Sequence, residues 1–142
     1  MVARLAFLLV VLAFAVAGCG GSGSDEGSEG SAKQKATIAG LEANDHGSAT
    51  VEDSGKTEVE LDDNYFEPTV LEGKPGENAL LELKNEGGTE HNFTLEDQSI
   101  DEDVEAGEET EVMVKIPQSG ELSFYCKYKD LGMAGALKAE TG

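Results

Sequence analysis

Short runs in which apolar and polar residues alternate fill the chain from about residue 37 onward. A period of two is typical of β-strands, because successive side chains of a strand point to opposite faces. Segments rich in Gly, Pro and Asn separate the runs, and no stretch of this region has a helical period of useful length. The pattern predicts strands over TEVEL (57–61), NALLELKN (78–85), HNFTLE (91–96), TEVMVKI (110–116) and ELSFYC (121–126). We therefore expect an all-β antiparallel sandwich or barrel.

The segment over residues 37–56, which contains His46, has a weaker pattern, and we expect either a first strand or a partly irregular loop there. Alternation also predicts which side chains face the core. His91 shares a face with the apolar residues of HNFTL, and Cys126 shares a face with the leucine and phenylalanine of ELSFYC. His91 opens its strand and Cys126 closes its strand. If these strands are antiparallel neighbours, both side chains meet at one pole of the sandwich, and Met133 in the following loop lies over the same pole.

The first residues of the chain read as a targeting segment. Residues 5–17 are apolar and follow the basic Arg4. This run is too short to span a bilayer, which needs about 20 residues, and it fits the hydrophobic core of a secretory signal. The run ends in Val-Ala-Gly before Cys19, which resembles the lipobox of bacterial lipoproteins, where the cysteine carries lipid and begins the mature chain. The alternative is an ordinary signal peptide followed by an incidental cysteine.

Residues 20–31 contain only glycine, serine and acidic residues, so they have nothing to bury and predict a flexible tether. The expected organisation is a lipoprotein signal peptide over 1–18, a lipidated Cys19 with a disordered tether over 19–36, and a folded domain over 37–142. Such an arrangement would hold the domain at the outer, extracytoplasmic face of a bacterial membrane.

The formal net charge of −19 and the pI of about 4.2 exclude binding to nucleic acid or to an anionic membrane through general electrostatics. An acidic surface fits a cationic partner, and it also fits a protein adapted to high salt.

The cysteine count leaves one thiol without a disulfide partner. The chain has two cysteines, and if Cys19 carries lipid, Cys126 has no internal partner. Free cysteines are commonly buried and inert, so Cys126 is either a core residue or a ligand. An imidazole, a thiol and a thioether at one pole would form a soft donor set, which suits copper better than calcium or magnesium.

These motifs, in this order, resemble the cupredoxins, and most closely their plastocyanin-like branch. The matching segments are NYFEPTVLEGKPGENALLELKNEGGTEHNFTLED, VEAGEETEVMVKIPQSGELSFYC and LGMAGALKAE, and the resemblance covers residues of about 57–142. It implies a Greek-key β-sandwich with one copper ion at a pole, acting as a one-electron carrier between larger redox partners. It also implies that His91, Cys126 and Met133 are the histidine, thiolate and axial thioether ligands. Asn92 falls where the family often has an asparagine that ties the ligand loops together.

One family feature is missing from this sequence. The family has a second histidine ligand, normally the third residue after the cysteine, and that position is Lys129 here. The loop from Cys126 to Met133 is also one residue shorter than the common spacing, so inserting one histidine after Tyr128 would restore both ligand and length. We interpret the pattern as a one-residue deletion. A lysine is protonated at neutral pH and is a poor ligand, so three donors remain, and this set favours Cu(I).

Four functions are therefore open at the level of sequence. The first is a membrane-anchored copper-binding electron carrier, whose redox partner would be basic, such as a cytochrome. The second is a Cu(I) carrier or storage module that uses the same residues. The third is a copper-free protein-binding sandwich with His91 and Cys126 in its core. The fourth is an enzyme with Cys126 as nucleophile and His91 as base. Nothing in the sequence suggests an oxyanion hole or a third group that would orient the base, so we expect no enzyme.

Overall fold

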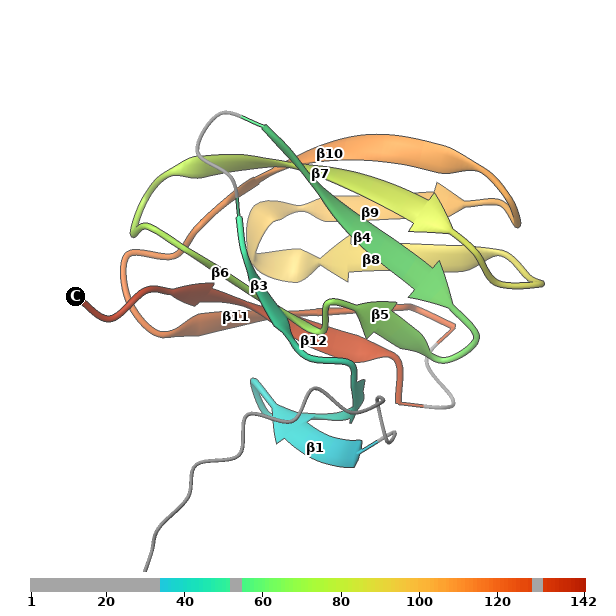
Figure 1. The fold of residues 1–142 in the computed structure, drawn as a ribbon, viewed down its shortest axis with the longest axis horizontal. Coiled ribbons are helices and arrows are strands. Elements are labelled where there is room, and N and C mark those ends of the chain that lie inside the picture. The colour runs from blue at the N-terminus through green and yellow to red at the C-terminus, as the bar shows by residue number, and fades with distance from the viewer. Residues whose placement is uncertain (1–33, 52–54, 129–131) are drawn as a thin grey trace, which may run out of the picture.

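The computed structural model describes residues 34–51, 55–128 and 132–142 (Figure 1). The predicted signal peptide, the predicted lipidation site Cys19 and Lys129 lie outside these ranges. The described elements are β1 (Gln34–Ile38), β2 (Leu41–Asp45), β3 (Ser48–Thr50), β4 (Lys56–Asp62), β5 (Tyr65–Glu67), β6 (Val70–Gly73), β7 (Asn78–Asn85), β8 (His91–Leu95), the 3-10 turn η1 (Glu96–Gln98), β9 (Ile100–Val104), β10 (Glu109–Lys115), β11 (Glu121–Tyr125) and β12 (Ala134–Ala139). Within these ranges, no helix has the length and apolar character needed to span a bilayer.

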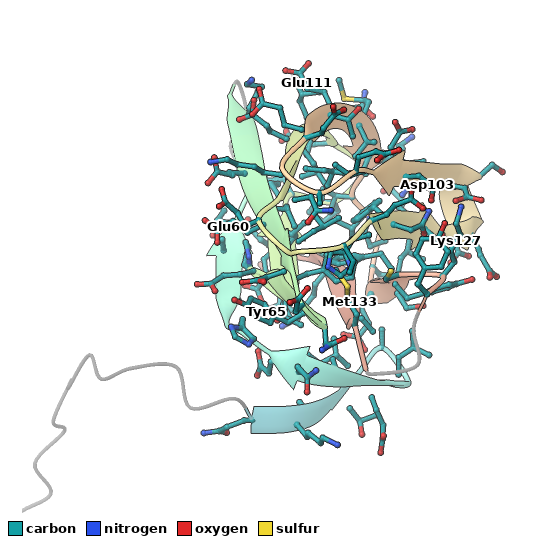
Figure 2. The ribbon with its side chains drawn as sticks, turned by 90° about the vertical axis from the view of Figure 1, so that its right-hand side faces the viewer. Glu60, Tyr65, Asp103, Glu111, Lys127 and Met133 are labelled. Atoms are coloured by element: carbon teal, nitrogen blue, oxygen red, sulfur yellow. The ribbon has the colours of Figure 1, made fainter. Side chains whose placement is uncertain are left out.

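Two sheets stack on each other, which confirms the predicted all-β sandwich. One sheet has the strand order β10-β7-β4-β5 and the other β3-β6-β12-β11-β8-β9 (Figures 1 and 2). The chain changes sheet six times, after β3, β5, β6, β7, β9 and β10. The sheets are mixed and not antiparallel throughout, because β4 pairs with β7, and β6 pairs with β12 and β3, in parallel. A crossover between the sheets returns the chain in its original direction, and this makes those pairs parallel.

The five predicted strands correspond to β4, β7, β8, β10 and β11. Their inward side chains form the core between the sheets. Phe66 lies edge-on to Phe93 and Phe124, with ring centroids 6.0 and 5.0 Å away, and the centroids of Phe93 and Phe124 are 4.8 Å apart. Phe93 and Phe124 are fully buried, which confirms that the faces they share with His91 and Cys126 point inward.

The β1–β2 hairpin stands apart from both sheets (Figure 1). It begins at Gln34, three residues before the expected start of the folded domain. The hairpin contacts β12 and β5, and Ala43 in β2 is buried.

Carboxylates crowd the outer face of the four-stranded sheet. Glu60 in β4 is the register partner of Glu67 in β5. Partial burial, helped by the negative charges of Glu67 and Glu58, raises the pKa of Glu60 above its ordinary value of 4.5. The folded state therefore favours the neutral form of Glu60. Its contribution to the free energy of unfolding is present at low pH and is lost as the pH rises through the raised pKa.

Glu60→Gln is accordingly expected to raise the free energy of unfolding at pH 7 by roughly 0.5 kcal/mol, since it removes one member of a like-charged pair. The gain should vanish below about pH 4.5, where Glu60 is itself neutral. Urea unfolding at pH 7 and pH 4 measures both values. Glu77→Gln, on an exposed turn, is the control and is expected to leave stability unchanged at both pH values.

Candidate metal centre

Strands β8 and β11 are antiparallel neighbours, which is the arrangement that the predicted meeting of His91 and Cys126 depends on. Tyr125 of β11 is the register partner of Thr94 of β8. The backbone N–H of Lys127 donates to Oδ1 of Asn92 over 3.2 Å. Lys127 and Asn92 directly follow Cys126 and His91 in the chain. His91 and Cys126 therefore lie at the same end of the sandwich.

Met133 joins this end through the backbone. The N–H of Cys126 donates to the carbonyl oxygen of Met133 over 3.0 Å. Cys126 is a free cysteine, and both residues belong to the apolar core, with 1% and 3% of their surface exposed. Figure 2 shows Met133 between the two sheets, with Lys127 and Asp103 to one side of it and Tyr65 to the other. We call the end of the sandwich that holds His91, Cys126 and Met133 the donor pole.

The His91 ring is buried, and its surroundings distinguish its two nitrogens. Nε2 has no hydrogen-bond partner and lies 3.5 Å from Oδ1 of Asp63. Gly87 also faces Nε2, and a Cβ at that position would lie only 2.7 Å from it. A metal-bound imidazole commonly turns its other nitrogen toward a carboxylate. With Asp63 facing Nε2, Nδ1 is the nitrogen that His91 would offer to a metal. The sequence pattern did not identify Asp63.

Asn92 links the segments around the donor pole through its side-chain hydrogen bonds, in the role that the resemblance implies. It is fully buried, and its Nδ2 donates to Oδ1 of Asp101 over 2.7 Å and to Oδ1 of Asp103 over 2.8 Å. Its Oδ1 accepts the Thr94 hydroxyl and the N–H of Lys127. One side chain therefore fixes β8, β9 and the residue after Cys126.

Two side chains after Cys126 form the exposed rim of the donor pole. Nζ of Lys127 lies 2.6 Å from Oδ1 of Asp103, and together with Asn92 it lowers the pKa of Asp103. Tyr128 is 51% exposed, and its hydroxyl donates to Glu90 over 2.7 Å, which raises the pKa of Tyr128. The rim thus presents an aromatic ring held between charged groups.

His46 occupies a different environment. Its ring stacks on Tyr65 with centroids 3.5 Å apart, and its Nδ1 lies 3.3 Å from Oε2 of Glu67. The hydroxyl of Tyr65 donates to Asp62 over 2.7 Å, which raises the pKa of Tyr65 to about 12. These contacts engage His46 in a stack on β5, and none of them involves a residue of the donor pole.

The donor set fits copper better than a hard cation. The donor pole offers one imidazole and two sulfur atoms, and soft sulfur ligands select Cu(I). In residues 34–51, 55–128 and 132–142, no three His, Cys, Asp or Glu side chains group closely enough to hold a metal ion. A metal at this pole would therefore depend on the thioether of Met133 as well as on His91 and Cys126.

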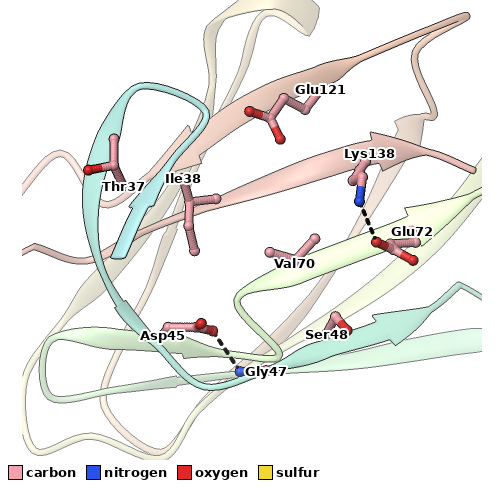
Figure 3. A pocket seen from close by; sticks show the side chains of 9 residues that line it. All are labelled: Thr37, Ile38, Asp45, Gly47, Ser48, Val70, Glu72, Glu121 and Lys138. Atoms are coloured by element: carbon pink, nitrogen blue, oxygen red, sulfur yellow. Dashed lines mark hydrogen bonds and ion pairs between the residues drawn. The ribbon is translucent and has the colours of Figure 1, made fainter. Parts of the chain in front are cut away.

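A pocket of about 350 Å³ lies away from the donor pole, between the hairpin and the six-stranded sheet (Figure 3). Ile38 and Val70 contribute apolar surface to it. Nζ of Lys138 pairs with Oε1 of Glu72 over 2.9 Å on its wall (Figure 3). Because this cation already has a partner, we assign no ligand to the pocket.

Gly87→Ala is expected to weaken metal binding at the donor pole about tenfold, because the added Cβ would displace the His91 ring. Gly88→Ala is a matched control one residue away, since a Cβ there would meet nothing within 4 Å. Competition against a coloured Cu(I) chelator measures both affinities. Equal affinities for the two variants would contradict His91 as a ligand.

Known proteins resemble this chain in sequence and in fold. A family model described as a cupredoxin-like domain matches residues 30–138. The copper-resistant cuproprotein CopI of Pseudomonas aeruginosa is 39% identical over 70 residues, which cover 49% of this chain and 36% of CopI. The match therefore spans about a third of the length of that relative.

Two solved structures have a similar fold. The metal-binding domain of the Cu(I)-exporting P-type ATPase CopA from Streptococcus pneumoniae D39 aligns with a TM-score of 0.55 and 15% identity, covering 68% of this chain and 98% of that domain. Reduced auracyanin from the photosynthetic bacterium Roseiflexus castenholzii aligns with a TM-score of 0.51 and 15% identity, covering 62% of this chain and 98% of auracyanin. At these identities the likeness shows the fold alone.

Proposed function

Because the chain belongs to the family of cupredoxin-like domains, we propose that it is a copper-binding protein anchored to the outer face of a bacterial membrane. Binding of Cu(I) is the function that the geometry supports best. Cys126 carries this proposal, because it is a buried free thiol whose backbone is hydrogen-bonded to Met133 and whose next residue is hydrogen-bonded to Asn92, beside His91. The match to CopI, named a copper-resistant cuproprotein, supports copper as the metal.

A role as one-electron carrier is the second candidate. A copper ion bound at the donor pole would supply one-electron chemistry between Cu(I) and Cu(II). The hydrogen bonds of Asn92 support this role, because they hold strand β9 and the residue after Cys126 in one arrangement next to His91. The exposed acidic residues Asp63, Glu86 and Glu90 near this pole support a basic redox partner, such as a cytochrome.

A binding role is favoured over an enzymatic one. Asp63 does face His91, so a carboxylate that could orient the imidazole is present. Cys126, however, is only 1% exposed, and a nucleophile must reach its substrate. We therefore propose that the protein is not an enzyme.

Metal titration of the purified full chain tests the proposal. Under anaerobic conditions we expect uptake of one equivalent of Cu(I), measured by competition with a chromophoric chelator, and no intense colour when Cu(II) is added. An intense blue or green colour with Cu(II) would instead favour the electron carrier. Failure to take up either ion stoichiometrically would refute the copper function and leave a copper-free protein-binding sandwich.

Membrane anchoring depends on Cys19. Cys19→Ser is expected to move the protein from the membrane fraction to the soluble fraction, because a serine cannot form the thioether bond to the lipid. Fractionation of bacterial cells followed by immunoblotting measures the distribution. Ser22→Ala, three residues further on, is the control and is expected to leave the protein with the membrane.

A further inference from the structure

Asn44 of β2 links the β1–β2 hairpin to the donor pole. The backbone N–H of Asn44 donates to the carbonyl oxygen of Gly132 over 3.0 Å. Its side-chain Nδ2 donates to the carbonyl oxygen of Asn64 over 2.7 Å. Asn44 is therefore bonded to two loops that are far apart in the sequence.

Each of these loops lies next to a residue that carries or faces a donor. Gly132 directly precedes Met133, the thioether donor. Asn64 directly follows Asp63, whose carboxylate lies 3.5 Å from Nε2 of His91. Asn44 thus joins the segment that carries Met133 to the turn whose carboxylate faces His91.

The hairpin is fastened at its base, so Asn44 projects from a fixed point. The N–H of His46 donates to the Thr69 hydroxyl oxygen over 2.6 Å, and the N–H of Thr69 donates to the Gly47 carbonyl over 2.9 Å. Thr69 itself is fully buried, and its hydroxyl donates to the carbonyl of Phe66 over 2.9 Å. These bonds anchor the end of β2 to the corner between β5 and β6.

We propose that Asn44 is a positioning residue of the donor pole, which holds Met133 and the Asp63–Asn64 turn at a fixed separation before the metal binds. This inference rests on the proposed Cu(I) function. A site whose donors are already in place loses less conformational freedom on binding, and it therefore binds more tightly. Removing the Asn44 amide would also leave the Asn64 carbonyl without this donor.

The test compares Asn44→Ala and Asn44→Asp with Lys35→Ala in the full chain. Lys35 is the register partner of Asn44 on β1 and is exposed, so its replacement perturbs the same hairpin without touching the donor pole. The aspartate variant keeps the size of the side chain but cannot donate to Asn64, and it serves if the alanine variant is poorly folded.

Two measurements separate positioning from metal binding. Both Asn44 variants remove the side-chain bond to Asn64 and keep the backbone bond to Gly132. In the metal-free protein, we therefore expect the NMR signal of the Asn64 amide to shift and broaden in both variants, and the Met133 methyl signal to shift because the Asp63–Asn64 turn is no longer held at a fixed separation from it. Both signals are expected to stay unchanged in Lys35→Ala. Competition with a Cu(I) chelator is expected to show about a tenfold loss of affinity in the Asn44 variants only.

Unchanged Met133 and Asn64 signals in both Asn44 variants would overturn the inference, and so would an equal loss of Cu(I) affinity in Lys35→Ala. If the unmodified protein takes up no Cu(I), the proposed function fails. The signals of the metal-free protein then still decide whether the Asn44 side chain fixes the Asp63–Asn64 turn relative to Met133.

Discussion

Replacing Cys126 with serine is expected to weaken Cu(I) binding at least about a hundredfold. Removing a residue that only orients a metal ligand costs about 10- to 100-fold in affinity, and removing the ligand itself should cost more. The thiolate is the one anionic soft donor of the donor pole, and a serine hydroxyl is a hard donor that stays protonated. His91 and Met133 would remain, but both are neutral ligands.

The same change also affects the fold, so stability has to be measured separately. Cys126 is 1% exposed in the apolar core, and burying a hydroxyl there costs about 1–3 kcal/mol. Urea unfolding of the metal-free variant measures this cost, and chelator competition below the unfolding transition measures the affinity. Ser123→Ala is the control, because Ser123 lies on β11, which ends one residue before Cys126, and is outside the donor pole. Undiminished Cu(I) affinity in Cys126→Ser would place Cys126 among the ordinary core residues and remove the basis of the proposed function.

Inserting a histidine between Tyr128 and Lys129 is expected to create an intensely coloured Cu(II) site. The chain would then supply two imidazoles, one thiolate and a weak axial thioether, which is the ligand set of blue-copper electron-transfer sites. The insertion also restores the loop length that the cupredoxin resemblance implies. Optical absorption and electron paramagnetic resonance after addition of Cu(II) measure the new site.

An alanine inserted at the same place is the matched control, because it restores the loop length without adding a ligand. We expect the alanine insertion to stay colourless with Cu(II). If both insertions behave alike, the missing histidine does not explain the difference between this chain and the electron carriers of its family, and the one-residue deletion is the wrong interpretation.

Local pattern was sufficient to predict β4, β7, β8, β10 and β11. Each of these strands has one face toward the core, and the other face is solvated or, as in β8, lined by polar groups, so its residues alternate. The same alternation placed His91 and Cys126 on inward faces. Their position at one pole then followed from a single assumption, that β8 and β11 are antiparallel neighbours, which the register of Tyr125 with Thr94 confirms.

Other strands left no such pattern. β12 (AGALKA) lies in the middle of its sheet and is buried at every position except Lys138, so polar residues do not alternate along it. β9 (IDEDV) lies at the sheet edge and is mostly polar. β5 and β6 are only three and four residues long, too short to establish a period.

The all-β class, the inward faces of the main strands and the candidate soft donors could all be predicted from the sequence, because they depend on residue type and on spacing along the chain. Three contacts could not be predicted in this way: Asp63 faces His91, His46 stacks on Tyr65, and Asn44 bridges Gly132 and Asn64. Each of these contacts joins segments that meet only when the two sheets and the hairpin have packed, and no local periodicity encodes how such segments meet.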